Sequence, residues 1–322
     1  MIEQQDLFET YKLDNKYRKK ALKAWRRLEE IYDDYLLIQG RLELNANFIT
    51  GQLKKDLKEV HSIQFRIKDP EHLIAKIITK SYLGSINKGN YRQKVTDLIG
   101  LRALHLFKDD WVPIHDYITK HWRLNEPPTA NIRDGDSQEM FEKMGCEVKV
   151  HPAGYRSVHY LIRNELSIDE IQISEIQVRT IFEEGWSEVD HKIRYPYNQN
   201  NEIINQYLVM FNRLAGSADE MGSFIKLLQL HFERQEQESR KTAQEQTEII
   251  NQLKEQVDQM SIKGTEKDTF RASLDDLEKR ASKQHSIREA LEEFSHESRL
   301  SPDFDLLKNI FLNKPEKNLP SR

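Results

Sequence analysis

The sequence predicts an α+β protein, with a mixed β-sheet flanked by helices and a C-terminal helical hairpin or coiled coil. Short runs of β-branched and aromatic residues, separated by turn-forming residues, fill the middle of the chain, about 61–197. The stretch before residue 61 repeats apolar residues at helical spacing. Residues 197–301 contain no proline and are rich in Glu, Gln, Lys and Leu, which favours helix. Strands gathered between helical regions indicate the α+β class.

Composition limits the kind of protein further. The 322 residues correspond to about two domains of ~150 residues. The chain has 38% hydrophobic and 32% charged residues. This composition excludes a collagen-like, a mucin-like or a fully disordered protein. The single cysteine, Cys146, excludes an intramolecular disulfide framework and a Cys-type zinc site. No apolar run approaches the ~20 residues of a membrane span, and the polar start does not resemble a signal peptide. We therefore expect a cytoplasmic protein without a membrane partner.

The N-terminal region is expected to form amphipathic helix. One apolar stripe follows helical spacing and comprises Leu22, Trp25, Leu28, Ile31 and Tyr35. Residues 16–27 also contain seven basic side chains, although the whole chain has a net charge of −4. A solvated helix face explains this basic segment better than a nucleic-acid footprint, which stays as the minority interpretation.

Three strands are predicted in the middle region, within residues 97–107, 157–163 and 170–179. The last two are joined through residues 164–169. Residues 123–150 are polar and contain Pro-Pro, Asp-Gly-Asp and Met-Gly, so we expect a long loop there.

A helix should follow the third strand directly. Thr180 and Glu183 form a capping-box pattern at its start, and Pro196 should stop it. Its apolar stripe is expected to consist of Trp186, Val189 and Ile193.

The C-terminal part carries short heptad-like seams. Ile250, Leu253, Val257 and Met260 are spaced by three, four and three residues, and a turn is expected near 261–265. Such seams can also pair between copies of the chain, which would give a homo-oligomer through these helices.

Polar residues on the third strand suggest chemistry. Period-two geometry places Glu175, Gln177 and Arg179 on one face of this strand. A carboxylate, an amide and a guanidinium in line suit an anionic, metal-bound ligand, whereas the alternative is a surface ladder of opposite charges.

The first strand carries a charge where an apolar residue would be expected. Arg102 lies within this strand and requires an ionic partner or a ligand-facing edge, because an unpaired buried charge is costly. His105 has the opposite parity, so we interpret it as a structural histidine.

Two further clusters combine cations with other functional groups. Residues 154–159 bring together Tyr155, Arg156 and His159, an aromatic ring for stacking and two groups that can contact phosphates. Arg66 and Lys68 precede a helix start at Pro70, where an anion would be favoured. Separated acids, several cations and an aromatic ring together predict a site for Mg²⁺, polyphosphate and a nucleobase.

Five motifs follow one another in the order of a known family. They are Arg66-x-Lys68, Asp97-x-x-Gly-x-Arg102, Gly154-Tyr-Arg-Ser-x-His159, Glu175-Ile-Gln-Val-Arg-Thr180 and Trp186-x-x-x-x-His191. In this order they resemble the synthetase domain of the RelA/SpoT family, and most closely the small alarmone synthetases, over about residues 45–225. The resemblance implies a nucleotidyltransferase-like fold and Mg²⁺-dependent transfer of pyrophosphate from ATP to the 3′-hydroxyl of GDP or GTP, with release of AMP. No region resembles the hydrolase domain of the family.

The resemblance also implies a domain plan. N-terminal helices in residues 1–60 would pack on a synthetase domain in 61–225, followed by a charged helical extension in 226–300 and a tail in 301–322.

Roles for single residues are likewise implied only by the resemblance. Asp97 and Glu175 would hold Mg²⁺, and Glu175 would also activate the attacking hydroxyl. The donor side would comprise Arg66, Lys68 and Arg102, with Arg66 and Arg102 on either side of the adenine. The acceptor side would comprise Tyr155, Arg156, His159, Gln177 and Arg179. His191 would support the helix after the strand.

Three positions depart from the family pattern. His72 stands where a Ser is common near the donor phosphates, Glu184 stands where many guanosine-specific enzymes have Asn, and His151 replaces a basic residue before Gly-Tyr-Arg-Ser. Since the acids are retained, these departures concern the identity of the acceptor.

Two alternatives therefore stay open. In the first, the acceptor is the 3′ CCA end of tRNA or an adenine nucleotide, as in toxic relatives of the small synthetases. A basic string would then guide the tRNA, consisting of Lys76, Lys80, Lys88, Arg92 and Lys94. In the second, the protein is a non-catalytic, nucleotide-binding regulator that acts through its C-terminal helices.

Overall fold

A computed structural model describes residues 4–80, 84–167, 170–194, 201–259, 269–270 and 272–273. The chain divides into two compact units, Met1–Glu220 and Met221–Arg322. All strands and the candidate site belong to the first unit, so the N-terminal helices and the sheet form one body.

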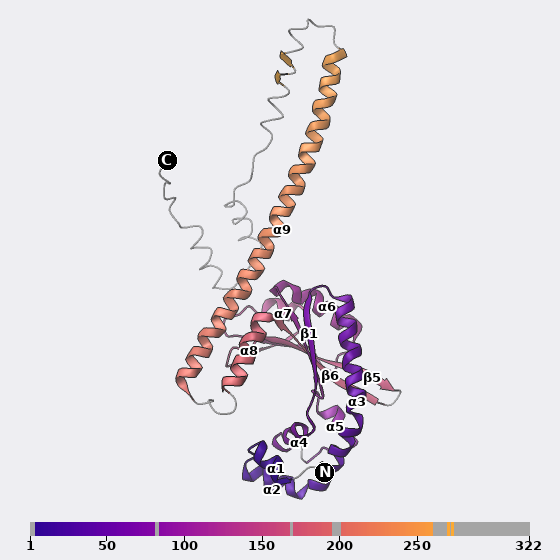
Figure 1. Cartoon of the computed structure of the whole chain (residues 1–322), viewed down its shortest axis with the longest axis vertical. Helices are drawn as coiled ribbons and strands as arrows, with labels where there is room; N and C mark the ends of the chain where they lie inside the picture. The colour runs from indigo at the N-terminus through magenta and orange to yellow at the C-terminus, as the bar shows by residue number, and fades with distance from the viewer. Residues whose placement is uncertain are drawn as a thin grey trace. The chain divides into compact units, whose positions relative to one another are not determined.

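The centre of the first unit is a six-stranded mixed sheet in the order β1-β2-β6-β5-β3-β4 (Figure 1). The strands are β1 (Val60–Ile67), β2 (Ile99–His105), β3 (Thr129–Ile132), β4 (Glu147–Val150), β5 (Ser157–Ser167) and β6 (Glu170–Thr180). β2 pairs with β6 in parallel and β3 with β4 in parallel, while the other neighbours are antiparallel. The prediction of an α+β fold with a mixed sheet and three of its strands, β2, β5 and β6, is confirmed.

Two parts of the sheet differ from the sequence-based expectation. β1 was not predicted, although Ile63, Phe65 and Ile67 alternate with polar residues as expected of an edge strand with one buried face. The expected long loop at residues 123–150 is wrong, because it contains β3, the short helix α7 (Glu139–Lys143) and β4. These strands of four residues carry too little periodicity to be recognised, and their pairing with β5 and with each other defines them.

The sheet is covered on one face by two helices. The long helix α3 (Trp25–Asp56) packs against β1 and β2, as seen beside the sheet in Figure 1. The helix α6 (Trp111–His121) follows the turn η1 (Lys108–Asp110) and covers β5, where the Trp111 indole donates to the Tyr160 hydroxyl at 2.9 Å. The buried residues of β2, β5 and β6 face these helices.

The N-terminal helices confirm most of the predicted apolar stripe. Trp25, Leu28, Ile31 and Tyr35 are buried, but Leu22 is 51% exposed. The reason is a break in the helix, since α2 (Asn15–Lys23) ends before α3 begins, and the stripe does not continue across the junction. The shorter helix α1 (Gln4–Thr10) precedes them.

Short helices carry the chain between β1 and β2. α4 (Pro70–Thr79) starts with Pro70 in its first turn, as predicted, and the Asp69 carboxylate caps it by accepting from the His72 N–H at 2.9 Å. The short α5 (Tyr91–Lys94) then leads to β2.

The helix after β6 begins as predicted. α8 (Ile181–Arg194) has the capping box, in which the Glu183 N–H donates to the Thr180 hydroxyl at 3.1 Å and the Thr180 N–H to the Glu183 carboxylate at 2.9 Å. Of the expected apolar stripe only Trp186 is buried, whereas Val189 and Ile193 are exposed. The buried turn of α8 lies against the start of α9 (Glu202–Gln259), since the Trp186 indole donates to the Leu208 carbonyl at 2.9 Å.

The predicted C-terminal helix is confirmed to Gln259, in a single helix of 58 residues. The expected turn at 261–265 and the tail at 301–322 lie outside the described residues. Among the helices of the described part, none combines the length and the apolar character needed to cross a bilayer.

Candidate active site

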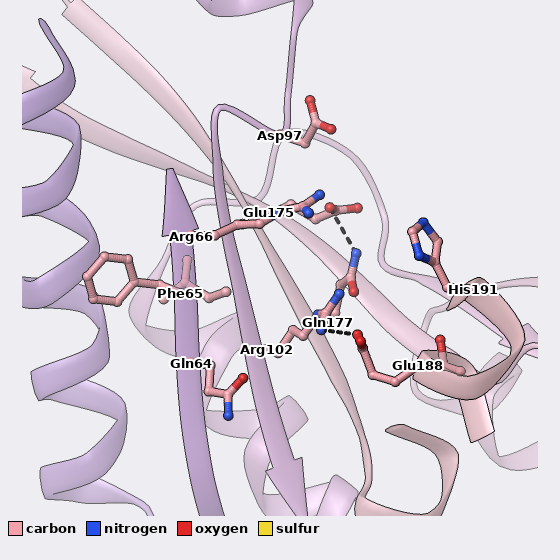
Figure 2. A pocket seen from close by; sticks show the side chains of 12 residues that line it. Gln64, Phe65, Arg66, Asp97, Arg102, Glu175, Gln177, Glu188 and His191 are labelled. Atoms are coloured by element: carbon pink, nitrogen blue, oxygen red, sulfur yellow. Dashed lines mark hydrogen bonds and ion pairs between the residues drawn. The ribbon is translucent and has the colours of Figure 1, made fainter. Parts of the chain in front are cut away.

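A pocket of about 420 Å³ opens on the face of the sheet opposite α3 (Figure 2). Its side chains come from four elements: β1, β2, β6 and α8. Asp97, which precedes β2, adds a carboxylate. The lining residues that carry polar groups are Gln64, Arg66, Asp97, Arg102, Glu175, Gln177, Ser187, Glu188 and His191.

Strand register places the functional groups in two rows across the sheet. Arg66 lies opposite Gly100, which in turn lies beside Glu175. One step along the strands, Gln64, Arg102 and Gln177 form the second row, which His159 of β5 extends. Because side chains two residues apart share a face, both rows point into the pocket.

Gly100 lies between Arg66 and Glu175 in the first row. A Cβ at this position would lie 4.0 Å from the Arg66 side chain, an ordinary van der Waals contact. The Arg66 side chain extends across β2 toward Glu175, as Figure 2 shows.

The Glu175 carboxylate is held by two neighbours. Its Oε1 lies 3.1 Å from His159 Nδ1, and its Oε2 accepts from Gln177 Nε2 at 3.1 Å. Burial acts to raise the pKa of Glu175, but the contacts with His159 and Gln177 outweigh it, so the pKa lies below its ordinary value. Glu175 is therefore ionised at neutral pH.

The Asp97 carboxylate lies at the other end of the pocket, where Figure 2 shows it facing the same cavity as Glu175. Its Oδ2 lies 2.9 Å from Lys68 Nζ and 2.7 Å from Lys76 Nζ. Burial acts to raise its pKa, but the two lysines hold the pKa below its ordinary value. Its other oxygen, Oδ1, is buried and has no hydrogen-bond partner among the residues described.

Arginines on β2 and β6 are tied to α8 by carboxylates. Arg102 pairs with Glu184 at 2.9 Å and with Glu188. Glu184 also lies 2.6 Å from Arg179, so it bridges the two arginines. The partner required by the charge of Arg102 is therefore supplied by α8. His105, on the opposite side of β2, is buried with its ring against the Phe107 carbonyl at 2.9 Å, which confirms its structural role.

Tyr155 joins the site through a polar chain. Its hydroxyl lies 3.0 Å from His159 Nε2, and His159 in turn contacts Glu175. The Arg179 guanidinium carbon lies 5.6 Å from the centre of the Tyr155 ring. Gln177 Oε1 accepts from Arg179 at 3.3 Å, which closes the connection between the predicted acceptor residues and Glu175.

Arg156 does not belong to this group. Its guanidinium is buried and lies 3.7 Å from Glu183 and 3.5 Å from the Asn212 carbonyl, away from the pocket lining. Arg156 directly precedes β5, and its contacts connect this loop to α8 and α9. Its assignment to the acceptor side stays a prediction.

Other predicted residues occupy distinct places. His191 lines the pocket itself and stands at the right in Figure 2. Lys68 is buried, with 4% exposure, and contacts Asp97. His72 is exposed on α4 with its ring stacked on Tyr11 at 5.6 Å, and it does not line the pocket.

Three contacts in and around the site were not predicted from the sequence. Glu188 pairs with Arg102 from a position one helical turn after Glu184, a spacing that could have suggested it. Lys76 lies on α4 and gave no local signal for its contact with Asp97. Asn212 of α9 donates to the Gly154 carbonyl at 2.8 Å, and only the tertiary structure brings these residues together.

The described residues contain no cluster of three or more His, Cys, Asp or Glu side chains able to hold a metal. Asp97 and Glu175 still suit Mg²⁺, because this ion commonly uses one or two carboxylates and completes its shell with water and substrate phosphates. The buried Asp97 Oδ1 without a hydrogen-bond partner is consistent with such a ligand.

Comparison with known proteins gives a match within this part of the chain. Residues 65–200 match the family described as "Region found in RelA / SpoT proteins". A GTP pyrophosphokinase of Bacillus subtilis, YwaC, is 25% identical over 138 residues, which are 42% of this chain and 58% of that protein. The chain thus aligns with little more than half of this curated relative.

Among solved structures, a GTP pyrophosphokinase family protein from Streptococcus pneumoniae is 22% identical, with a TM-score of 0.44, over 60% of this chain and 89% of that one. The small alarmone synthetase 1 of Bacillus subtilis, bound to its product pppGpp, is also 22% identical, with a TM-score of 0.44, over 63% of this chain and 97% of that one. The motifs quoted from the sequence all lie within the matched residues 65–200, and so do the pocket-lining residues other than Gln64. Over these residues, the chain carries the region found in RelA / SpoT proteins.

Proposed function

We propose that the protein is a GTP diphosphokinase that transfers pyrophosphate from ATP to the 3′-hydroxyl of GDP or GTP and releases AMP. The observation that carries this proposal is the pair of carboxylates, Asp97 and Glu175, facing one pocket beside Arg66 and Arg102. This pocket lies in the RelA / SpoT region, and the curated relative that matches it is named a GTP pyrophosphokinase. Both nucleotides are cytoplasmic metabolites, and we propose the reaction for that compartment.

Asp97 and Glu175 would hold Mg²⁺ between the two substrates. The bound ion would neutralise charge on the donor phosphates, which is the main requirement of phosphoryl-transfer chemistry. Oxygen ligands of the carboxylate type are the ones that Mg²⁺ prefers.

The donor ATP would lie on the β1 side of the pocket. Arg66 and Arg102 flank this side and would contact the adenine and the phosphates. Lys68 and Lys76 place two further positive charges against Asp97, where the donor phosphates are proposed to bind. These cations would orient ATP and stabilise the charge that develops on the bridging oxygen.

The acceptor nucleotide would lie on the β5 side. The Tyr155 ring would stack on the guanine, and His159, Gln177 and Arg179 would line the remainder of this side. The acceptor O3′ attacks the β-phosphorus of ATP, the bond from this phosphorus to the α–β bridging oxygen breaks, and AMP leaves. Glu175, ionised at neutral pH, would accept the proton of the 3′-hydroxyl.

Transfer to the tRNA 3′ end is less well supported by the structure. Of the basic string expected to guide tRNA, Lys76 pairs with Asp97, while Lys88 and Arg92 pair with Asp34. Lys94 donates to the Ser85 carbonyl at 2.8 Å. These four cations have partners within the protein, and the exposed members of the string are Lys80 and Lys88.

A competition assay distinguishes the acceptors. The full chain is incubated with Mg²⁺, ATP labelled in the β-phosphate, and GDP, GTP, ATP and deacylated tRNA together. The proposal predicts label on a guanosine nucleotide, released as 3′-pyrophosphate on cleavage. Label found solely on tRNA or on an adenine nucleotide would contradict it, and the absence of any transfer would favour a non-catalytic regulator.

A further inference from the structure

A second concave site lies in the first unit, between the α2–α3 junction and the end of α4. This hollow, of about 700 Å³, is lined by Lys16, Tyr17, Lys20, Lys23, Arg27 and Lys80, together with small and apolar residues of the same segments. It shares no lining residue with the pocket that contains Asp97 and Glu175. We call it the α2 hollow.

The α2 hollow has a strongly one-sided charge. Five of its lining residues are cations and none is acidic. Within the described parts of the chain, no acidic side chain forms an ion pair with Lys16, Lys20, Lys23 or Lys80. This differs from the other lysines near the sheet, such as Lys68 and Lys76, which are paired with carboxylates.

The basic segment of the sequence separates into two groups in the structure. Arg18 is used internally, since it donates to the Leu13 carbonyl at 2.7 Å and covers the Phe8 ring. Lys19 and Arg26 lie outside the hollow, and Arg26 pairs with Glu30 on α3. The other four cations, at spacings of four, three and four residues, all line the hollow.

This arrangement carries an electrostatic cost. Like charges three or four residues apart on a helix repel one another and destabilise it. Lys16 and Lys20 lie within α2 at such a spacing, as do Lys20 and Lys23. Lys80, brought in from the end of α4, adds further repulsion. An anionic ligand would remove this repulsion.

We propose that the α2 hollow is a binding site for a ligand with several phosphate groups, separate from the substrate pocket. Lysine ammonium groups are point-charge ligands for phosphate, and Tyr17, half-buried at the edge, offers a ring to a base or a sugar. Lys16, Lys20 and Lys23 span seven residues of α2, or about 10 Å of helix, and Arg27 of α3 and Lys80 of α4 add charges from other elements, so the hollow can contact several successive phosphates. The ligand is a free polyphosphate or nucleotide, or the backbone of a single-stranded nucleic acid, since both present the same chemistry.

Binding is tested on the full chain with two probes, inorganic tripolyphosphate and a single-stranded oligonucleotide. Isothermal titration calorimetry measures each probe against the unchanged protein, the variant Lys20→Glu/Lys23→Glu and the control Lys19→Glu/Arg26→Glu. The two variants change the net charge equally, but the control residues lie outside the hollow. We expect the Lys20/Lys23 variant to bind about tenfold more weakly, while the control variant loses much less.

The two probes distinguish the sources of the ligand. Selective loss of tripolyphosphate binding indicates a free polyphosphate or nucleotide. Selective loss of oligonucleotide binding indicates a nucleic-acid strand. In that case, the slope of log K for the oligonucleotide against log salt concentration should also become shallower by about 0.7 for each cation removed.

Equal binding by the two variants with both probes, or no binding to the unchanged protein, overturns the proposal. Binding of tripolyphosphate in the substrate pocket would leave the two variants equal, so it cannot imitate a positive result. A thermal melt of each variant shows whether the fold is retained. If the Lys20/Lys23 variant fails to fold, Lys20→Gln/Lys23→Gln is compared with Lys19→Gln/Arg26→Gln under the same criteria. None of these outcomes depends on whether the protein transfers pyrophosphate.

Discussion

Glu175 combines two properties that few side chains in the molecule share. It faces the pocket, and it is ionised because the contacts with His159 and Gln177 offset its burial. An ionised carboxylate in such a place can hold a cation or accept a proton, whereas a neutral amide of the same shape cannot accept the proton and lacks the negative charge that attracts the cation.

Replacing Glu175 by Gln should therefore abolish transfer while the fold is retained. We expect the turnover of the full chain to fall at least about a hundredfold, the usual effect of removing a general base. Turnover is measured with labelled ATP and GTP, and circular dichroism reports the fold. Glu147→Gln, on the exposed face of β4, is the matched control and should stay near the unchanged rate. Near-normal turnover of Glu175→Gln would refute the role of this residue.

Asp97 has a second role, since it neutralises Lys68. The Lys68 ammonium is buried, and its pKa is lowered by burial although Asp97 opposes this effect. Replacing Asp97 by Asn leaves a buried cation without its partner. We expect the free energy of unfolding to fall by about 2–3 kcal/mol, measured by urea denaturation.

A second substitution separates charge from packing. Adding Lys68→Met to Asp97→Asn should restore part of the lost stability, because it removes the buried charge. Adding Lys76→Met should restore less, since Lys76 is more exposed than Lys68. If both double variants regain the same free energy of unfolding, the stability lost in Asp97→Asn does not come from the buried charge of Lys68.

At the scale of elements, the first turns of α9 hold the loop that carries Tyr155. Gly154 has φ of +74°, and a Cβ there would lie 3.2 Å from the Asn212 amide nitrogen. Asn212 also donates to the Gly154 carbonyl, so the loop before β5 has little freedom. Its conformation depends on a helix that begins 48 residues later in the chain.

Gly154→Ala should disturb both stability and acceptor binding. The left-handed backbone and the contact with Asn212 together should lower the free energy of unfolding by about 1–3 kcal/mol. The KM for the acceptor should rise more than that for ATP, because Tyr155 moves with the loop. Gly135→Ala is the control, since Gly135 has φ of +87° but open space around it. If both variants lose the same stability and keep the same KM values, the contact with Asn212 has no role.

A buried carboxyl on α9 gives a pH dependence. Burial raises the pKa of Asp219 from 3.8 to about 7, and the neighbouring Glu183 adds to the effect. The unfolded chain loses this proton near pH 4, whereas the folded chain keeps it up to about pH 7. Asp219 therefore lowers the free energy of unfolding progressively as the pH rises between these values, and the loss is complete above them.

Asp219→Asn should remove this pH-dependent fall in the free energy of unfolding. We expect the variant to be more stable than the unchanged protein at pH 8, with the difference disappearing near pH 4, as measured by denaturant unfolding at each pH. A difference that stays constant with pH would show that Asp219 does not titrate in this range.

At the scale of the whole molecule, α9 presents an apolar stripe to its surroundings in the first unit. Ile203, Tyr207, Met210 and Leu214 are exposed and are spaced by four, three and four residues. This is the spacing of a helix that pairs with another helix. The homo-oligomer, which we expected through helices further along the chain, stays a prediction, and this exposed stripe is a second place where it can be tested.

Charges introduced into this stripe should weaken self-association. We expect Met210→Glu/Leu214→Glu to reduce the mass measured by light scattering relative to the unchanged chain. Gln206→Glu/Arg213→Gln adds the same charge at exposed positions outside the stripe and should leave the mass unchanged. A monomeric unchanged chain, or equal masses in all three, would contradict association through α9.

Much of the site could be predicted because strand alternation and helix capping depend only on residues that are close in the sequence. Alternation along a strand placed Glu175, Gln177 and Arg179 on one face, and parity separated Arg102 from His105. The capping box at Thr180 fixed the start of α8 for the same reason. Alternation does not reach Arg156, which precedes β5, and its contacts with Glu183 and Asn212 depend on the tertiary structure.

The amino-acid sequence alone determined the class of fold, the starts of α4 and α8 and the faces of β2 and β6, since these follow from spacing over a few residues. The tertiary structure decided which strands are neighbours, that Lys68 and Lys76 share Asp97, and that Glu184 bridges two arginines. These contacts join segments far apart in the chain, and the free energy that selects them comes from packing the whole sheet and its helices, which no local pattern contains.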